Sequence, residues 1–196
     1  MMKLKLLIAA GAALALSGCF GGARTPPELM TLTAAQVRAA DATRTAAQGE
    51  TITIVEPTVP QALRTQRVPV QTSPTAVAYL QNAQWVEAPN ALFGRLLSET
   101  IAATTGRVVL DPNQYSHDPG TRVTGQLQMF GLDAQRMEVV LVYDAVMERR
   151  GGTGVTTRRF EARTAVAEAT PAAVAPALND VANRVAAEVA TWVGGA

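Results

Sequence analysis

Seven segments of the chain alternate between apolar and polar positions or are rich in β-branched residues, and this pattern predicts strands. They are residues 51–55, 67–71, 75–80, 107–110, 121–132, 137–148 and 155–164. Pro57 and Pro60 end the first strand, while Pro69 restricts the second to a sheet edge or a bulge, because proline cannot donate to the ladder. A glycine-rich stretch, 149–154, joins the last two strands as a hairpin. We therefore expect a mostly antiparallel sheet.

Two other segments show the helical period of apolar residues. The first starts at Pro89, which suits the first turn of a helix, and ends at Gly106. Its apolar stripe is Leu92, Phe93, Leu96, Leu97 and Ile101. The second opens at Thr170 and reaches Trp192, and Pro176 either kinks it or marks its true start. Because both stripes need an apolar partner, we expect an α+β fold, with the two main helices packed on one face of the sheet.

The start of the chain has the pattern of a secretory signal. Two lysines precede the apolar run 6–16, which is shorter than the roughly 20 residues that a membrane-spanning helix needs. The run ends in Leu16-Ser17-Gly18-Cys19, which resembles a bacterial lipobox. The resemblance implies recognition of Leu16, Ser17 and Gly18 by a signal peptidase, cleavage before Cys19, and lipidation of Cys19. The alternative is an ordinary signal peptide with a cysteine near its end.

These features divide the chain into segments. Residues 1–18 are the expected lipoprotein signal peptide, and 19–28 form an acylated tether that reaches at most about 30 Å when extended. Residues 29–196 are expected to form a single α+β domain, in which 29–33 is a short strand and 34–50 is a mobile connector or a weak helix. Two acyl chains already hold a protein stably on a membrane, so a triacylated cysteine would be a lasting anchor.

Charge and composition exclude several classes of protein. The chain has 17 Lys or Arg and 16 Asp or Glu residues and a net charge of +1, so bulk positive charge cannot hold a nucleic acid. Cys19 is the single cysteine, which excludes an intramolecular disulfide and a cysteine-based metal site. His117 is the single histidine, and the sequence has no phosphate loop or nucleophile elbow. We therefore expect no metal, no cofactor and no catalytic constellation.

The hairpin formed by the last two strands is rich in arginine. Arg149, Arg150, Arg158 and Arg159 lie close together in the sequence and are candidates for docking a carboxylate surface of a partner or anionic head groups. The alternative is a soluble hairpin edge that charge protects. Residues 139–143 are apolar on both faces, which indicates either a central strand covered on both sides or an exposed apolar face that meets a partner or a lipid tail.

Two neighbouring motifs resemble a known family. The stretch 66–70 matches a Gln-Arg-Ile-x-Val strand, and 79–87 matches a Tyr-Leu-x-Asn-x-x-Trp-x-Glu segment. With the leucine-rich helix, the antiparallel strands and a last helix that reaches Trp192, these motifs make the chain similar to the ABC-type transport auxiliary lipoproteins, which include the PqiC-like lipoproteins. The likeness covers nearly the whole mature chain, and Pro69 and Pro176 are local departures from the pattern.

The resemblance implies a non-enzymatic part of an envelope lipid-transport system, in which an MCE-domain protein reaches across the periplasm from an ABC permease and ATPase. The lipoprotein would dock on the outer-membrane end of that conduit, as a homo-oligomer if the partner is a ring. Phe20, in place of Asp, favours the outer membrane by analogy with enterobacterial sorting, with the domain facing the periplasm.

The first interface candidates are Tyr79, Trp85 and Glu87, because aromatic anchors carry much interface energy. Trp85 could equally fill the core. Two other functions compete with the transport role: a structural or assembly lipoprotein of another envelope complex, and a periplasmic hydrolase that uses His117.

Overall fold

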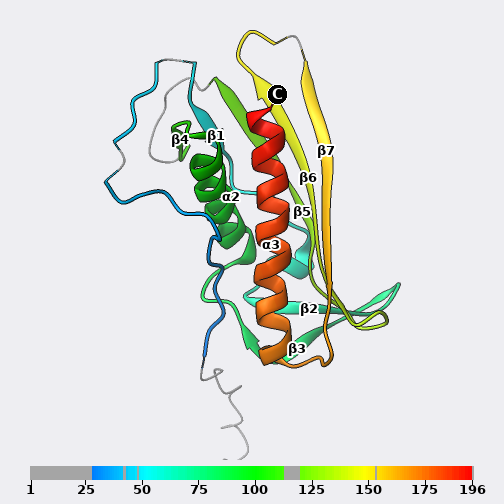
Figure 1. The fold of residues 1–196 in the computed structure, drawn as a ribbon. Helices are drawn as coiled ribbons and strands as arrows, with labels where there is room; N and C mark the ends of the chain where they lie inside the picture. Colours follow the sequence, from blue (N-terminus) through cyan, green and yellow to red (C-terminus); the bar gives the residue numbers. More distant parts are fainter. Residues whose placement is uncertain (1–27, 42, 48, 113–119, 153, 196) are drawn as a thin grey trace, which may run out of the picture.

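The structure is a computed structural model, and it describes residues 28–196 apart from 42, 48, 113–119, 153 and 196. The expected signal peptide, Cys19 and His117 therefore lie outside the described residues. Within them, two helices and a seven-stranded mixed sheet form the fold (Figure 1). In chain order the elements are β1 (Ile52–Ile54), the 3-10 turn η2 (Gln61–Leu63), β2 (Arg67–Ser73), β3 (Ala76–Gln84), α2 (Pro89–Thr105), β4 (Val109–Leu110), β5 (Thr121–Asp133), β6 (Glu138–Arg149), β7 (Val155–Ala165) and α3 (Pro171–Gly194).

The sheet is organised around β5. On one side β6 runs antiparallel along the length of β5, and β7 continues antiparallel beyond β6. On the other side β5 pairs in parallel with β1 at its start, where Ile54 lies opposite Val123, and with β2 at its end, where Val70 lies opposite Leu132. β3 adds to β2, and β4 adds to β1. The prediction of a mostly antiparallel sheet is confirmed, although β1 and β2 enter it in parallel.

α2 and α3 lie on the same face of the sheet, as the two apolar stripes predicted (Figure 1). Alternate side chains of β6 are buried on this face: Val139, Leu141, Tyr143, Ala145 and Met147. Phe93 of α2 meets the ring of Tyr143 edge-on at 5.3 Å between centroids, and Phe160 of β7 meets Trp192 of α3 at 5.6 Å. Val140, on the opposite face, is buried as well. β6 is therefore a central strand.

The helix ends follow local signals. Pro89 is the first residue of α2, and Gly106 ends that helix in the left-handed region with a φ of 70°. α3 begins at Pro171 and continues through Pro176, so Pro176 does not mark its true start. Pro176 lies early in α3 and removes only one backbone hydrogen bond there, and the buried face of the rest of the helix holds the element together.

Pro69 is accommodated by a bulge and not by a sheet edge. β2 lies between β3 and β5, and its register against β3 shifts between Arg67 and Pro69. Pairing with β5 includes Val70, the residue after the proline. A Cβ at Gly131 of β5 would lie 2.2 Å from the carbonyl oxygen of Pro69. The missing side chain at Gly131 is therefore what allows β2 to approach β5 this closely.

The segment before β1 is extended and is tied to the helices. A strand was predicted at 29–33, and the structure has a single isolated bridge there, in which Met30 pairs in parallel with Trp85. Farther along, the N–H of Ala35 donates to Oδ1 of Asn183 in α3 at 2.7 Å. The described part of 34–50 contains no helix, so of the two alternatives, a mobile connector or a weak helix, the weak helix is wrong. This segment has few large apolar side chains, and without an apolar stripe nothing favours a packed helix.

Candidate functional site

Tyr79 is half-buried on β3 and its ring is held from two sides. The guanidinium of Arg67 lies 4.3 Å from the ring centroid, and the Tyr79 hydroxyl donates to the carbonyl oxygen of Ala62 at 3.4 Å. The ring is thus oriented by the protein and still partly open to solvent. Because its ring is partly exposed and held in one orientation, Tyr79 stays a candidate interface residue.

Trp85 is a core residue. Only 1% of its surface is exposed, and its ring stacks on Phe130 of β5 with 5.3 Å between centroids. Its backbone is fixed on both sides, since its N–H donates to the carbonyl oxygen of Gln66 and the next residue donates to that of Met30. A side chain enclosed in this way cannot contact a partner. Of the two alternatives for Trp85, an interface residue or a core residue, the structure therefore supports the core residue.

Glu87 lies at the surface just before α2 and pairs with Arg95 in that helix. Nη1 of Arg95 donates to Oε2 of Glu87 at 2.7 Å, and Nη2 donates to the second carboxylate oxygen. This hydrogen bonding lowers the pKa of Glu87 and raises that of Arg95. Both side chains remain well exposed. A partner would therefore meet a fixed ion pair at this position.

The arginine-rich hairpin does not form one basic patch. In the register of β6 with β7, Arg158 lies opposite Ala145 on the helix-facing side, and Arg159 lies opposite Asp144 on the other face. The guanidinium of Arg158 lies 4.7 Å from the Phe160 ring centroid. Side chains of neighbouring residues in a strand point to opposite faces, so the close spacing in the sequence separates these cations in space.

The remaining arginines of the hairpin are also engaged. Nε of Arg159 donates to Oδ1 of Asp144 at 2.6 Å, and this contact lowers the pKa of the Asp144 carboxyl. Arg149 is half-buried and contacts the sulfur of Met147 at 3.8 Å. Arg150 lies in the following turn, beside Gly49. Arg158 and Arg159 therefore lie on opposite faces, which favours the charge-protected edge, and joint action of the four arginines on one partner surface stays a prediction.

Two hollows border α2, and carboxylates line both of them. The first encloses about 430 Å³ between α2 and the β1–β4 edge, and the second about 450 Å³ beside it. The carboxylate of Glu99 at the first hollow accepts from the backbone and side chain of Arg38. Glu56, which borders both hollows, accepts from Asn90. These two carboxylates are thus engaged in structural contacts.

The part of the chain that the structure describes contains neither a candidate metal cluster nor a candidate membrane-spanning helix. There, no group of three or more His, Cys, Asp and Glu side chains is placed to hold a metal ion. None of the described helices has the length and apolar character to span a membrane.

One surface, the uncharged β2–β3 hairpin, was not predicted from the sequence. No Asp, Glu, Lys, Arg or His occurs between Arg67 and Glu87, yet much of this segment is exposed in the β2–β3 hairpin. The signal that could have revealed it is the combination of missing charge with turn-forming Ser73 and Pro74, because an uncharged stretch with a turn at its centre cannot be buried along its whole length.

One family of known proteins matches most of the chain. The family model of the ABC-type transport auxiliary lipoprotein component matches residues 31–190. No curated protein matches the chain.

Solved structures support the fold. A Xanthomonas campestris protein of the DUF330 family is 15% identical, with a TM-score of 0.62 over 86% of this chain and 92% of its own. A second structure, of a protein described as uncharacterized, is 14% identical, with a TM-score of 0.62 over 86% of this chain and 98% of its own. At this identity the likeness concerns the fold alone. With the family model covering β1 to α3 almost completely, the chain belongs to the family of ABC-type transport auxiliary lipoprotein components.

Proposed function

We propose that this protein is a docking component of an ABC-type lipid-transport system, anchored to the outer membrane through acylated Cys19 and facing the periplasm. Its partner is an MCE-domain protein that carries lipid between the membranes, and through it the ABC permease and ATPase. The observation that carries the proposal is the family match over residues 31–190.

The lipid anchor is supported by the Leu16-Ser17-Gly18-Cys19 motif and by the family, whose members are lipoproteins. Phe20 supports sorting to the outer membrane. The tether from Cys19 to Glu28 is too short to let the domain cross the periplasm, so the transport conduit has to come to the anchored domain.

A docking role also fits the surface chemistry. The carboxylates of Glu56 and Glu99 at the hollows hold structural contacts, whereas Tyr79 and the Glu87–Arg95 pair offer an oriented ring and a fixed ion pair at the surface. We assign contact with the conduit to this region. Oriented aromatic rings and bidentate arginine pairs lose little side-chain entropy on binding, which suits an interface.

The test is capture of the transport subunits from intact envelopes. The acylated chain, with an affinity tag at its C-terminus, is crosslinked in cells of its own species, solubilised in detergent and purified, and the captured proteins are quantified. We expect an MCE-domain protein and its ABC permease in the wild-type sample, and a strong loss of both for Cys19→Ala. Capture of another outer-membrane assembly with neither transport subunit would favour the structural lipoprotein instead.

A further inference from the structure

The tip of the β2–β3 hairpin, residues 72–78, is an uncharged and exposed surface. It belongs to a run of 19 residues, 68–86, without any ionisable side chain of Asp, Glu, Lys, Arg or His. Within the tip, Ala76, Val77 and Ala78 are exposed, and Val77 keeps 47% of its surface open. An exposed strand at a sheet edge is normally protected by charged side chains. The β3 edge lacks this protection, since no charged side chain occurs in residues 68–86.

The opposite edge of the sheet shows the usual protection. β7 carries Arg158, Arg159, Glu161 and Arg163 within 11 residues. Its most exposed large apolar residue, Val155, is 60% open and lies at the other end of the long strands, where the β6–β7 hairpin turns (Figure 1). The two edges of one sheet are thus chemically different. A neighbour with little charge would suit the β3 edge only.

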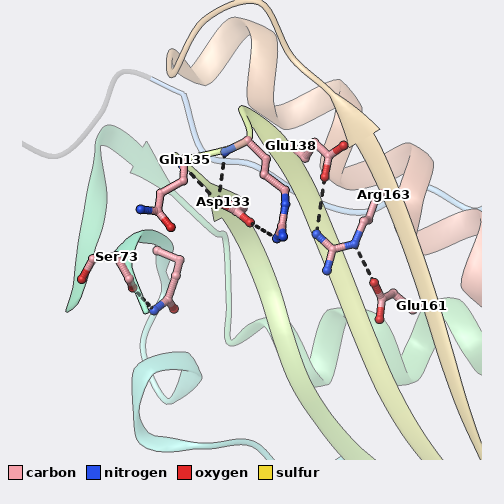
Figure 2. A network of polar contacts seen from close by, with 8 residues as sticks. Ser73, Asp133, Gln135, Glu138, Glu161 and Arg163 are labelled. Carbon is pink, nitrogen blue, oxygen red and sulfur yellow. Dashed lines mark hydrogen bonds and ion pairs between the residues drawn. The ribbon is translucent and has the colours of Figure 1, made fainter. Parts of the chain in front are cut away.

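Charged groups at the β5–β6 turn and on β7 compensate one another. Asp133 accepts from the backbone N–H groups of Gln135 and Arg136 at 3.0 and 3.2 Å and from the Arg136 side chain at 3.2 Å. Arg163 bridges two carboxylates, Glu161 at 2.6 Å and Glu138 at 3.4 Å. Figure 2 shows the Asp133 group beside the hairpin and the Arg163 group farther across the sheet, on β6 and β7. Among the described residues, Arg136 and Arg163 are thus each paired with a carboxylate.

The described chain begins in the same half of the molecule as the hairpin tip, but at the other end of β3 (Figure 1). The first described residues enter beside β3, where Met30 bridges to Trp85 (Figure 1). Leu29 and Val86, on either side of that bridge, are exposed to 47% and 46%. Cys19 precedes Glu28 by nine residues. An acylated Cys19 would hold the start of the described chain within about 30 Å of the bilayer surface.

We propose that the β2–β3 hairpin tip lies against the lipid surface and orients the body on its membrane. The inference rests on the proposed anchor at Cys19. The contact is uncharged, with Val77 as its large apolar side chain, so it does not depend on anionic lipid or on salt. It is also too small to hold the protein by itself, and it acts because the anchor keeps the tip at a high local concentration beside the bilayer.

The experiment uses the full acylated chain in vesicles of phosphatidylethanolamine and phosphatidylglycerol. Acylation uses the thiol of the single native cysteine, so Val77→Cys supplies a unique site for an environment-sensitive fluorophore. Val155→Cys is the matched control, because it starts from the same residue type with similar exposure at the far end of the sheet. Flotation with the vesicles first establishes that each variant is anchored, and circular dichroism establishes that it is folded.

We expect a lipid-borne quencher to reduce the fluorescence at position 77 at least threefold more than at position 155, with the same result in 0.5 M salt. Equal quenching at both positions in an anchored protein would overturn the inference and leave the anchor intact. Failure to float would count against the anchor itself. A photo-crosslinker at position 77 that yields a protein adduct in envelopes, and not a lipid adduct, would also overturn the inference.

Discussion

The ring of Trp85 fills a space between β3 and β5 that smaller side chains cannot fill. Trp85→Ala should lower the free energy of unfolding by about 3–5 kcal/mol, because it removes a buried ring and leaves a cavity beside Phe130. Trp85→Phe keeps a stacked ring and should cost about 1–2 kcal/mol. Denaturant unfolding of the anchor-free body measures both. A cost below 1 kcal/mol for the alanine variant would contradict the core role and return Trp85 to the surface candidates.

The Glu87–Arg95 pair makes a pH-dependent contribution of known sign. The hydrogen bond from Arg95 lowers the pKa of folded Glu87 below its ordinary value of 4.5, so the contribution is complete above that pH and is lost as the pH falls through the lowered pKa. Because both side chains are largely exposed, the pair is worth less than about 1 kcal/mol.

Glu87→Gln should therefore lower stability slightly at pH 7 and have no effect near pH 2.5. Chemical unfolding over this pH range measures the difference, and Glu188→Gln, at an exposed position of α3, is the control. A loss of equal size at both pH values would show that the carboxylate charge does not contribute.

At the scale of single residues, the sequence indicated which residues belong to the family motif, but it did not indicate whether each one is buried or exposed. The Tyr79 to Glu87 motif was found, but the sequence placed Trp85 equally well in the core or at an interface. What decides is the parallel bridge to Met30, more than fifty positions away. The sequence places Arg158 and Arg159 next to each other, but alternation along β7 sends their side chains to opposite faces of the sheet.

The junction of β2 with β5 depends on Gly131. A methyl group there would lie 2.2 Å from the carbonyl oxygen of Pro69, and backbone cannot move away as a side chain can. Gly131→Ala should therefore cost about 1–3 kcal/mol and loosen the β2–β3 hairpin. Gly154→Ala is the matched control, because nothing lies within 4 Å of its added Cβ and it should change stability by less than about 0.5 kcal/mol. Hydrogen exchange in β2 measures the loosening, and equal protection in both variants would contradict it.

At the scale of elements, periodicity predicted the two helices and the strands, because the helices present a continuous buried stripe and the long strands alternate over much of their length. It did not predict that β1 and β2 pair in parallel with the two ends of β5. Strand direction in a sheet depends on how distant segments meet, and the short strands carry no local signal for it. Pro69 illustrates this limit, since the sequence allowed an edge or a bulge and the long-range register selected the bulge.

For the whole molecule, packing supports the predicted α+β fold, while function depends on other information. The fold is shared with structures only 14% and 15% identical, and such likeness carries no activity. The family over residues 31–190 carries the transport association. Anchoring to the membrane and contact with the conduit are proposals, based on the Leu16-Ser17-Gly18-Cys19 motif and on the proposed docking surface, and both can be tested directly.

The most direct measurement compares anchored and unanchored forms of the chain in cells that lack it. The readout is transport-dependent integrity of the outer membrane, for example survival in detergent. The wild-type chain should restore integrity, while Cys19→Ala, exported to the periplasm at matched abundance with its fold intact, should fail to do so. Full restoration by the unanchored form, or lipid turnover by the purified body alone, would contradict the account of a membrane-held docking component.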